Sequence, residues 1–249
     1  MITPLRWGRK YKIGAACAGF HLGKEWEKNG KRNGGKWLTD YLKNAFRGLE
    51  LSPPLFYKWP TGIRFEIGSP EMGAWINREK RVLNNHYFEK ALHRALSICN
   101  AAFSATDEVD VVYETLRHRR HKIKIKSHII RQVSSSGHRN VIFESRKAGS
   151  LKGLHWKTAY VTGATSSEIN YAAIFLSIVN ADFSRRKPSL RGRCYLVNRT
   201  RGMVLHLYDD RGLDLIATEK SALREIYTRY NAWILAYDKA RIDAMFSDE

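Results

Sequence analysis

Two helical patterns organise the hydrophobic positions in the middle of the chain. In residues 84–103, apolar side chains recur every three or four positions, which predicts an amphipathic helix capped by Asn84 or Asn85. A second predicted helix follows the possible caps Ser166 and Ser167 and is apolar around nearly its whole circumference. We therefore expect the second helix to be covered on more than one side.

Each predicted helix lies between two strand-like runs. Ile63–Ile67 precedes the first helix and Val109–Tyr113 follows it, while Thr158–Thr162 precedes the second and Cys194–Val197 follows it. Both units therefore read β-α-β.

The ends of the two helices carry nearly the same sequence. Residues 96–104 read LSICNAAFS and residues 176–184 read LSIVNADFS. The match includes Ser and Asn, which do not favour helix interiors, and this favours an internal duplication. The alternative is that two core helices converged on the same residues. In either case these positions predict core and helix-end structure and not a functional site.

The remainder of the second unit continues in β structure. A hairpin is predicted with Gly202 at its turn, and a second hairpin turns through DDRG with Gly212 in the corresponding role. Helical patterns follow over residues 219–235 and 238–246, and LTDYLKNAF near the N-terminus also reads as helical. The order predicts an α+β protein, with a mostly antiparallel sheet and helices on one face.

We divide the chain into four segments, of which residues 51–249 form one domain. Residues 1–50 are a basic N-terminal extension, and residues 51–114 are the first β-α-β unit. Residues 115–153 are a basic insertion, and residues 154–249 are the second unit with its hairpins and C-terminal helices.

The composition excludes several classes of protein. No apolar stretch approaches the ~20 residues that cross a bilayer, and the N-terminal sequence is a poor signal peptide. Three widely spaced cysteines, Cys17, Cys99 and Cys194, argue against a disulfide framework or a zinc site. We expect a cytoplasmic protein without a membrane partner or a cofactor.

Charge is the unusual property, since the 249 residues carry a formal net charge of +19. Residues 115–143 contain eight Lys or Arg and no acid, and residues 183–208 contain seven more, again without an acid. In residues 205–249 nine Asp or Glu face six Lys or Arg. Blocks of one sign favour a cationic face, although a solvated basic surface is the alternative.

The basic insertion is the first candidate site. Ile123, Ile125 and Ile129 alternate with cationic residues, which predicts a half-buried strand whose cations share one face and match phosphate spacing. An edge strand protected by lysines is the alternative, and a helix would scatter the cations. The candidate nucleic-acid contacts are Arg117, Arg119, Arg120, Lys122, Lys124, Lys126, Arg131, Arg185, Arg186, Lys187, Arg191 and Arg193.

Aromatic residues near basic sequence are weaker candidates for stacking on bases. They are Tyr11, Trp26, Trp37, Tyr57 and Trp59, although such residues more often belong to the core. The sequence contains no zinc-finger, RNP or KH signature, so we expect binding through phosphates.

Several motifs together resemble a known family. WPTGIRFEIG, YFEKALHRALSICNAAF, VNADFSRRKPSL, YDDRGLD and YTRYNAWILAYD resemble an uncharacterised bacterial family defined only as a domain of unknown function. The resemblance covers roughly residues 55–113 and 165–246 and implies no activity. The signature positions that it implies are Trp59, Arg64, Glu66, Tyr208, Asp209, Asp210, Arg211, Gly212, Asp214 and Trp233.

The YDDRGLD turn is also a candidate metal site. Asp209, Asp210 and Asp214, completed by Glu66, are ligand types that Mg²⁺ and Ca²⁺ prefer. The structural alternative is a turn in which Arg211 pairs with a neighbouring carboxylate. The sequence contains no motif for a nucleophile, and Cys99 and Cys194 fall in predicted core elements.

Three functions follow in order of preference. The first is a non-enzymatic binding protein whose basic face holds DNA or RNA. The second is an immunity-type or assembly protein that binds an acidic protein partner. The third is a metal-dependent enzyme built on the Asp-rich turn.

Overall fold

The computed structural model describes residues 34–134, 140–149 and 151–247, with backbone only for 34–36. Asn33–Glu249 forms one compact unit. Most of the predicted N-terminal extension, with Tyr11, Cys17 and Trp26, lies outside the described residues.

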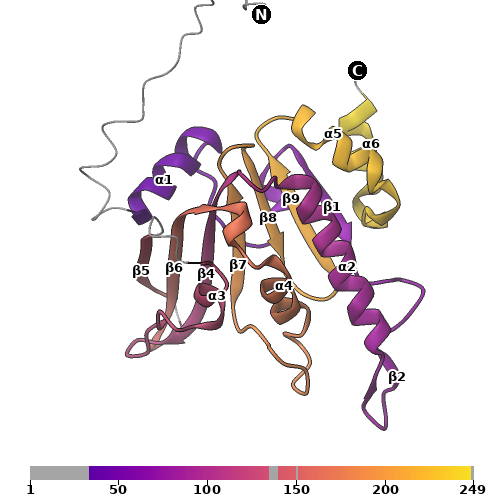
Figure 1. The fold of residues 1–249 in the computed structure, drawn as a ribbon, viewed down its shortest axis with the longest axis horizontal. Coiled ribbons are helices and arrows are strands. Elements are labelled where there is room, and N and C mark those ends of the chain that lie inside the picture. Colours follow the sequence, from indigo (N-terminus) through magenta and orange to yellow (C-terminus); the bar gives the residue numbers. More distant parts are fainter. Residues whose placement is uncertain (1–33, 135–139, 150, 248–249) are drawn as a thin grey trace, which may run out of the picture. The chain divides into compact units, whose positions relative to one another are not determined.

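A seven-stranded antiparallel sheet organises the fold (Figure 1). Its order is β1 (Gly62–Glu66), β9 (Gly212–Ala217), β8 (Met203–Leu207), β7 (Arg193–Asn198), β4 (Glu108–His118), β6 (Leu154–Thr165) and β5 (Asn140–Lys147). A separate hairpin pairs β2 (Trp75–Asn77) with β3 (Val82–Leu83). The predicted α+β class with a mostly antiparallel sheet is confirmed.

Helices cover both faces of the sheet. The first face carries α2 (Asn85–Ala102), α3 (His128–Arg131), α4 (Tyr171–Val179), α5 (Ser221–Arg229) and α6 (Ala236–Ser247). The second face carries α1 (Gly34–Ala45). Short 3₁₀ turns lie at Phe56–Lys58, Ser166–Glu168 and Asn231–Trp233. The prediction of helices on one face therefore holds for α2 to α6, whereas α1 packs on the other.

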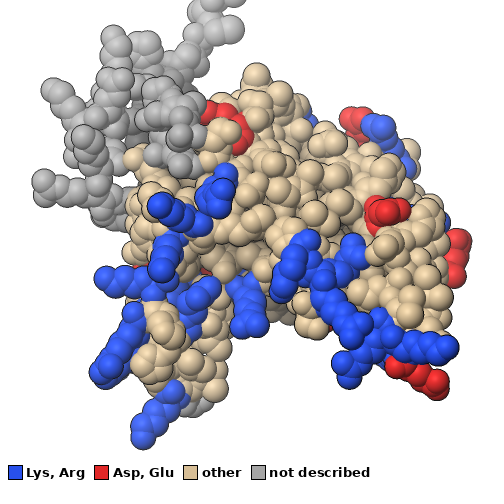
Figure 2. Space-filling view, turned by 60° about the horizontal axis from the view of Figure 1, so that its bottom comes forward, with Lys and Arg blue, Asp and Glu red and all other residues tan. Residues whose placement is uncertain are grey.

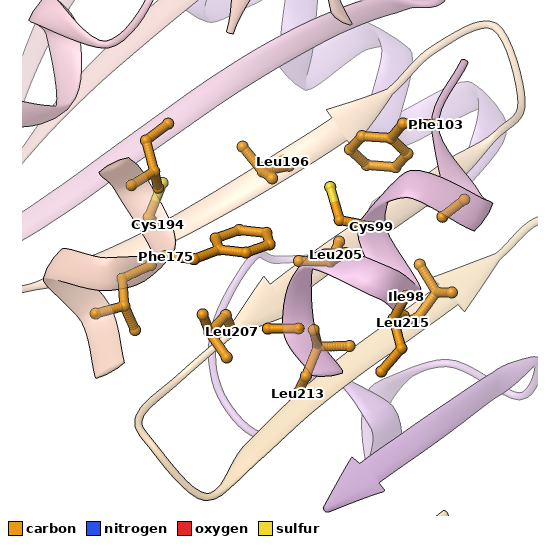
Figure 3. Close-up of a cluster of buried hydrophobic side chains, with 14 of the residues drawn as sticks. Ile98, Cys99, Phe103, Phe175, Cys194, Leu196, Leu205, Leu207, Leu213 and Leu215 are labelled. Atoms are coloured by element: carbon orange, nitrogen blue, oxygen red, sulfur yellow. The ribbon is translucent and has the colours of Figure 1, made fainter. Parts of the chain in front are cut away.

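The main core lies between the sheet and α2 and α4. Ile98 and Cys99 of α2 and Phe175 of α4 meet leucines of the sheet (Figure 3). Adjacent strand residues alternate between the two cores, since Leu205 belongs to this one and Val204 packs beneath α1. This alternation explains why the central strands are apolar at almost every position.

Both predicted β-α-β units exist as chain segments. α2 lies between β1 and β4 along the chain, with β2 and β3 inserted after β1, and α4 lies between β6 and β7. The two helices pack against each other. The repeated nonamers nevertheless differ in environment, because Asn100 is exposed whereas Asn180 is buried and donates to the Pro188 carbonyl. The duplication stays a hypothesis.

The predicted strand over residues 122–131 is wrong. The chain leaves β4 at His118, passes through turns, and forms α3 after Ser127. Ile129 and Ile130 are both buried, and two adjacent buried side chains suit a docked helix and not a half-buried strand. The predicted insertion instead supplies the end of β4, all of α3 and β5, the edge strand of the sheet.

Two local details also differ from the prediction. Asn170 is the residue that caps α4, because its side chain accepts a hydrogen bond from the Ala173 amide. Gly202, at the turn of the first predicted hairpin, has a positive φ of 61°, but Gly212 in the second does not adopt a left-handed conformation.

No helix among the described residues is long and apolar enough to cross a lipid bilayer.

Buried His206 should make stability depend on pH. Its ring stacks on Tyr195 with centroids 4.4 Å apart, and burial, reinforced by Arg193, lowers its pKa to about 3. An unfolded histidine titrates near 6.5, so below that pH only the unfolded state gains the proton. We expect this residue to lower the free energy of unfolding by roughly 1.4 kcal/mol per pH unit as the pH falls from 6.5.

Urea unfolding of His206→Gln at several pH values tests this expectation. The variant should lose part of the acid-side slope of the wild type, whereas exposed His86→Gln should keep all of it. Parallel slopes for wild type and His206→Gln would contradict the assignment.

Candidate functional site

The first basic segment follows the end of β4. β4 pairs with β7 only as far as Glu114, but with β6 as far as His118, so Thr115–His118 extend beyond β7. The turn that follows is held by its backbone, since the Arg119 amide donates to the Gly153 carbonyl and Lys157 Nζ donates to the Arg119 carbonyl, at 2.9 and 3.0 Å. The side chains of Arg119, Arg120 and Lys122 are exposed, whereas Ile123 is buried.

The second basic segment lies beside the same strand end. The Tyr113 hydroxyl of β4 donates to the Arg191 carbonyl at 2.9 Å, and a Cβ on Gly192 would overlap the Glu114 carbonyl. The Leu190 amide donates to the Ser177 carbonyl of α4 and fixes the segment from the other side. Two stretches more than fifty residues apart in sequence thus meet at one end of the sheet.

We call the exposed cations of these two segments the cationic band. Figure 2 shows Lys and Arg spread along this side of the molecule, with few Asp or Glu. The band consists of Arg117, Arg119, Arg120, Lys122, Lys124, Lys126, Arg185, Lys187 and Arg191. Arg131 is exposed on α3, directly after the first segment.

Within the described part of the chain, none of these nine side chains forms an ion pair. Carboxylates of the acidic C-terminal region pair elsewhere, as Asp238 does with Arg64 and Asp243 with Lys239. α5 and α6 lie at the opposite end of the view from the strand ends that carry the band (Figure 1). The positive charge of the band is therefore not neutralised by that region.

Two of the twelve predicted contacts instead have partners within the chain. Arg186 donates to Asn180 and Asn85 and lies 3.9 Å from the centroid of the Phe88 ring, and its burial lowers its pKa. Arg193 lies 3.6 Å from buried Glu114 and covers Trp156 at 4.2 Å. Both guanidinium groups hold the fold together.

His155 of β6 lies near several cations at this end of the sheet. The pKa of His155 is lowered, first by desolvation and then by Lys157, Lys147 and Arg119. Its Nδ1 lies 3.1 Å from the Ser145 hydroxyl. The cations named here come from β5, from β6 and from the turn after β4, so these three parts of the chain place positive charge near His155.

Sequence reasoning missed several exposed cations. Lys147 and Lys152 flank the β5–β6 turn, and Arg78, Lys80 and Arg81 form the β2–β3 turn. β5 was hard to recognise because most of its side chains are exposed and show no clear alternation. In the sequence, the cations of the β2–β3 turn are indicated only by a short basic stretch between two runs that could form strands.

The predicted stacking aromatics are not part of the band. Trp59 packs on Phe46 and donates to the Ala217 carbonyl, and Trp37 is covered by Arg199 at 4.2 Å. Tyr57 is 43% exposed but lies beside β1, at the other edge of the sheet.

The YDDRGLD turn is held by its own side chains. The Asp209 carboxylate accepts hydrogen bonds from the amides of Arg211 and Gly212, at 2.7 and 3.2 Å, and also binds the Arg211 guanidinium. Asp210 accepts from the Tyr87 hydroxyl of α2 at 2.8 Å. A Cβ on Gly212 would overlap the Tyr208 ring, so this glycine provides space and not a left-handed turn.

The other signature positions connect β1 to its surroundings. Arg64 lies 3.5 Å from both Asp214 and Asp238, and its Nε donates to the Tyr208 hydroxyl at 3.3 Å. Asp214 also accepts a hydrogen bond from the Phe56 amide at 3.1 Å.

The remaining signature positions contact α2. Trp233 stacks on Tyr230 and lies under the guanidinium of Arg94, which donates to the Glu66 carbonyl. These contacts are structural.

The predicted metal set is corrected by the geometry. Asp209 and Asp210 lie together with exposed Asp182, with ligand atoms within 4.8 Å of one another, and neither Asp214 nor Glu66 belongs to the group. Asp214 is directed to Arg64 and the Phe56 amide instead. Asp209 and Asp210 already bind Arg211 and Tyr87, so the turn has a sufficient structural explanation.

The two cysteines in the described residues are unsuited to nucleophilic chemistry. Cys99 and Cys194 are buried, and burial raises the pKa of both thiols, to about 12 for Cys194. A thiol with such a pKa stays protonated and unreactive at neutral pH.

The chain shares its sequence pattern with a known protein family. Residues 38–238 match the family described as Domain of unknown function (DUF3885), and the chain belongs to that family. The match is continuous, so it includes most of α1 and the whole of residues 115–153, which the motif resemblance left out.

A curated bacterial protein is similar along most of its length. It is the uncharacterized protein YnaE of Bacillus subtilis (strain 168), 25% identical over 216 residues that cover 80% of this chain and 98% of YnaE. No solved structure matches the chain significantly.

Gly212→Ala should destabilise the protein by about 1–3 kcal/mol, because the added methyl group must displace the Tyr208 ring that Arg64 holds. Chemical denaturation measures the effect. Gly73→Ala is the matched control, since a Cβ there comes no closer than 3.9 Å to another atom. Equal stability of the two variants would remove the steric role of Gly212.

Proposed function

We propose that this protein is a non-enzymatic binding protein that holds nucleic acid through phosphate groups on the cationic band. The observation that carries the proposal is the set of nine exposed Lys and Arg side chains at one end of the sheet, none of them ion-paired within the described residues. Bringing like charges together costs free energy, which a bound polyanion would offset by neutralising them. A nucleic acid would in addition gain entropy by releasing its own counterions.

The chemistry of the band suits phosphates. Arg117, Arg119 and Arg120 offer planar guanidinium groups for bidentate contacts, while Lys122 and Lys124 add compact charges. The backbone of Arg119 is held by hydrogen bonds to Gly153 and Lys157, so the chain that carries the neighbouring cations has a defined position after β4. Binding of this kind recognises the charge and shape of a nucleic acid. A cytoplasmic location would give the protein access to DNA and RNA.

An acidic protein partner is the second candidate, as expected of an immunity-type or assembly protein. Ile125 and Leu151 are 58% and 51% exposed in basic turns at this end of the sheet. Exposed aliphatic groups among cations suit an interface that combines electrostatic steering with apolar burial.

Salt titration of a fluorescent 20-mer tests the first proposal by anisotropy. Binding should weaken steeply with salt, with log K falling by roughly 0.7 per phosphate contact for each tenfold rise in salt on a single strand and 0.9 on a duplex. Changing Arg119, Arg120, Lys122 and Lys124 together to Ala should lower the affinity and flatten this slope.

A variant with the same loss of charge separates the band from net charge. Lys43, Lys58, Arg229 and Arg241 are exposed cations outside the band, and their joint change to Ala should leave most of the affinity. Equal losses in the two variants, or affinity that does not respond to salt, would refute the proposal.

A further inference from the structure

The β2–β3 hairpin projects from the rest of the fold (Figure 1). Its base is anchored, because Trp75 packs against Phe183 with ring centroids 5.8 Å apart and Asn84 bonds to Gly73 and Ala74. Leu83 also packs against the main core. The turn beyond this base is exposed from Arg78 to Arg81. We call Trp75–Leu83 the basic hairpin.

The turn of the basic hairpin carries concentrated positive charge. Arg78, Lys80 and Arg81 accompany a single acid, Glu79, and none of the four forms an ion pair within the described residues. The Lys80 amide donates to the Asn77 side chain at 2.8 Å, and Arg81 has a positive φ of 54°. This fixed turn presents its cations outward.

The hairpin also presents an apolar side chain to solvent. Ile76 is 71% exposed and Val82 is 44% exposed, whereas their neighbours Trp75 and Leu83 pack inward. An exposed isoleucine beside a basic turn suits a ligand that offers apolar groups beside negative charge. Duplex DNA does so in the major groove, where thymine methyl groups lie between two phosphate backbones.

The basic hairpin is continuous with the cationic band. Phe183 touches Trp75, and Arg186 donates to Asn85 at the start of α2, so the 183–187 segment lies against the base of the hairpin. The same segment supplies Arg185 and Lys187 to the band. Figure 2 shows basic side chains extending across this side of the molecule.

The dimensions of nucleic acids select one occupant. The major groove of B-DNA admits a two-stranded β-ribbon, whereas the major groove of A-form RNA is deep and too narrow for side chains to read. A single strand has no groove and would meet the band alone.

We propose that the basic hairpin enters the major groove of duplex DNA, with Arg78, Lys80 and Arg81 on the phosphates and Ile76 against thymine methyl groups. This inference rests on the proposed function and names its ligand as duplex DNA. The cationic band then follows the phosphates beside the groove.

The test compares a 24-base-pair A·T-rich DNA duplex with the same duplex containing deoxyuridine, which lacks only the thymine methyl group. Wild-type protein should bind the thymine duplex about threefold to fivefold more tightly, as expected from burying a methyl group. Ile76→Thr should keep the strand and lose this difference. Tyr237→Ser, at an 85% exposed position of α6, is the control and should retain it.

A second variant tests the cations of the turn. Changing Arg78 and Lys80 to Ala, and Arg81 to Asn, which tolerates positive φ, should weaken duplex DNA binding and flatten its salt dependence. Binding to a single strand of the same length should change little. Circular dichroism melting should show wild-type stability for both hairpin variants, because the altered side chains are exposed.

The outcomes separate this inference from the proposed function. If wild-type protein does not distinguish thymine from deoxyuridine, or Ile76→Thr still distinguishes them, the hairpin inference is overturned while salt-dependent binding to the band stands. Equal binding of duplex RNA and duplex DNA would also overturn it. If poly-L-glutamate binds as tightly as DNA and Ile76→Thr weakens it equally, an acidic protein takes the place of DNA. If no nucleic acid binds, both proposals fail.

Discussion

Burial of both faces of the central strands constrains the rest of this structure. Val204 and Ile216 pack beneath α1, while their neighbours Leu205 and Leu215 pack beneath the helices of the opposite face. A sheet that is apolar on both sides must be covered on both sides, because exposed apolar area of that size is unfavourable in water. The exposed cations of the band and of the hairpin accordingly lie at the strand ends, in the connecting loops and on the projecting hairpin.

The distribution of charge follows from this arrangement. Carboxylates of the C-terminal region are used near β1, where Asp214 and Asp238 surround Arg64 and fix the edge of the sheet. At the ends of β4 and β6 the cations outnumber the acids, and Glu114 is already shared by Arg146 and Arg193. The cations of the band therefore have no carboxylate partner within the described residues, and this favours a partner outside the chain.

Hydrophobic period was sufficient to predict the elements that bury a clear stripe or a continuous run. The helix over residues 85–102 and the strands that supply Ile63 and Val197 follow directly from such patterns. β5 has no such pattern because it is an exposed edge. The Ile-Lys alternation after β4 lies in irregular chain, where Ile123 is buried but Ile125 is exposed. The steric role of Gly212 could not be predicted, because it depends on where the Tyr208 ring lies in the folded chain. The two basic blocks could likewise be recognised in the sequence. The contact between Trp75 and Phe183, which places the hairpin beside the second block, could not be predicted from it.

The anchored base and exposed turn of the hairpin have a practical consequence for biochemistry. Trypsin cleaves after lysine and arginine, and it needs a substrate segment that leaves the folded body, as Arg78–Arg81 does. Lys122, Lys124 and Lys126 are also exposed, although buried Ile123 holds their segment against the core. The side chains that would face a polyanion are thus the ones that the protease recognises. A ligand bound to this surface would shield them from trypsin, so the pattern of protected cleavage sites would show which part of the surface is occupied.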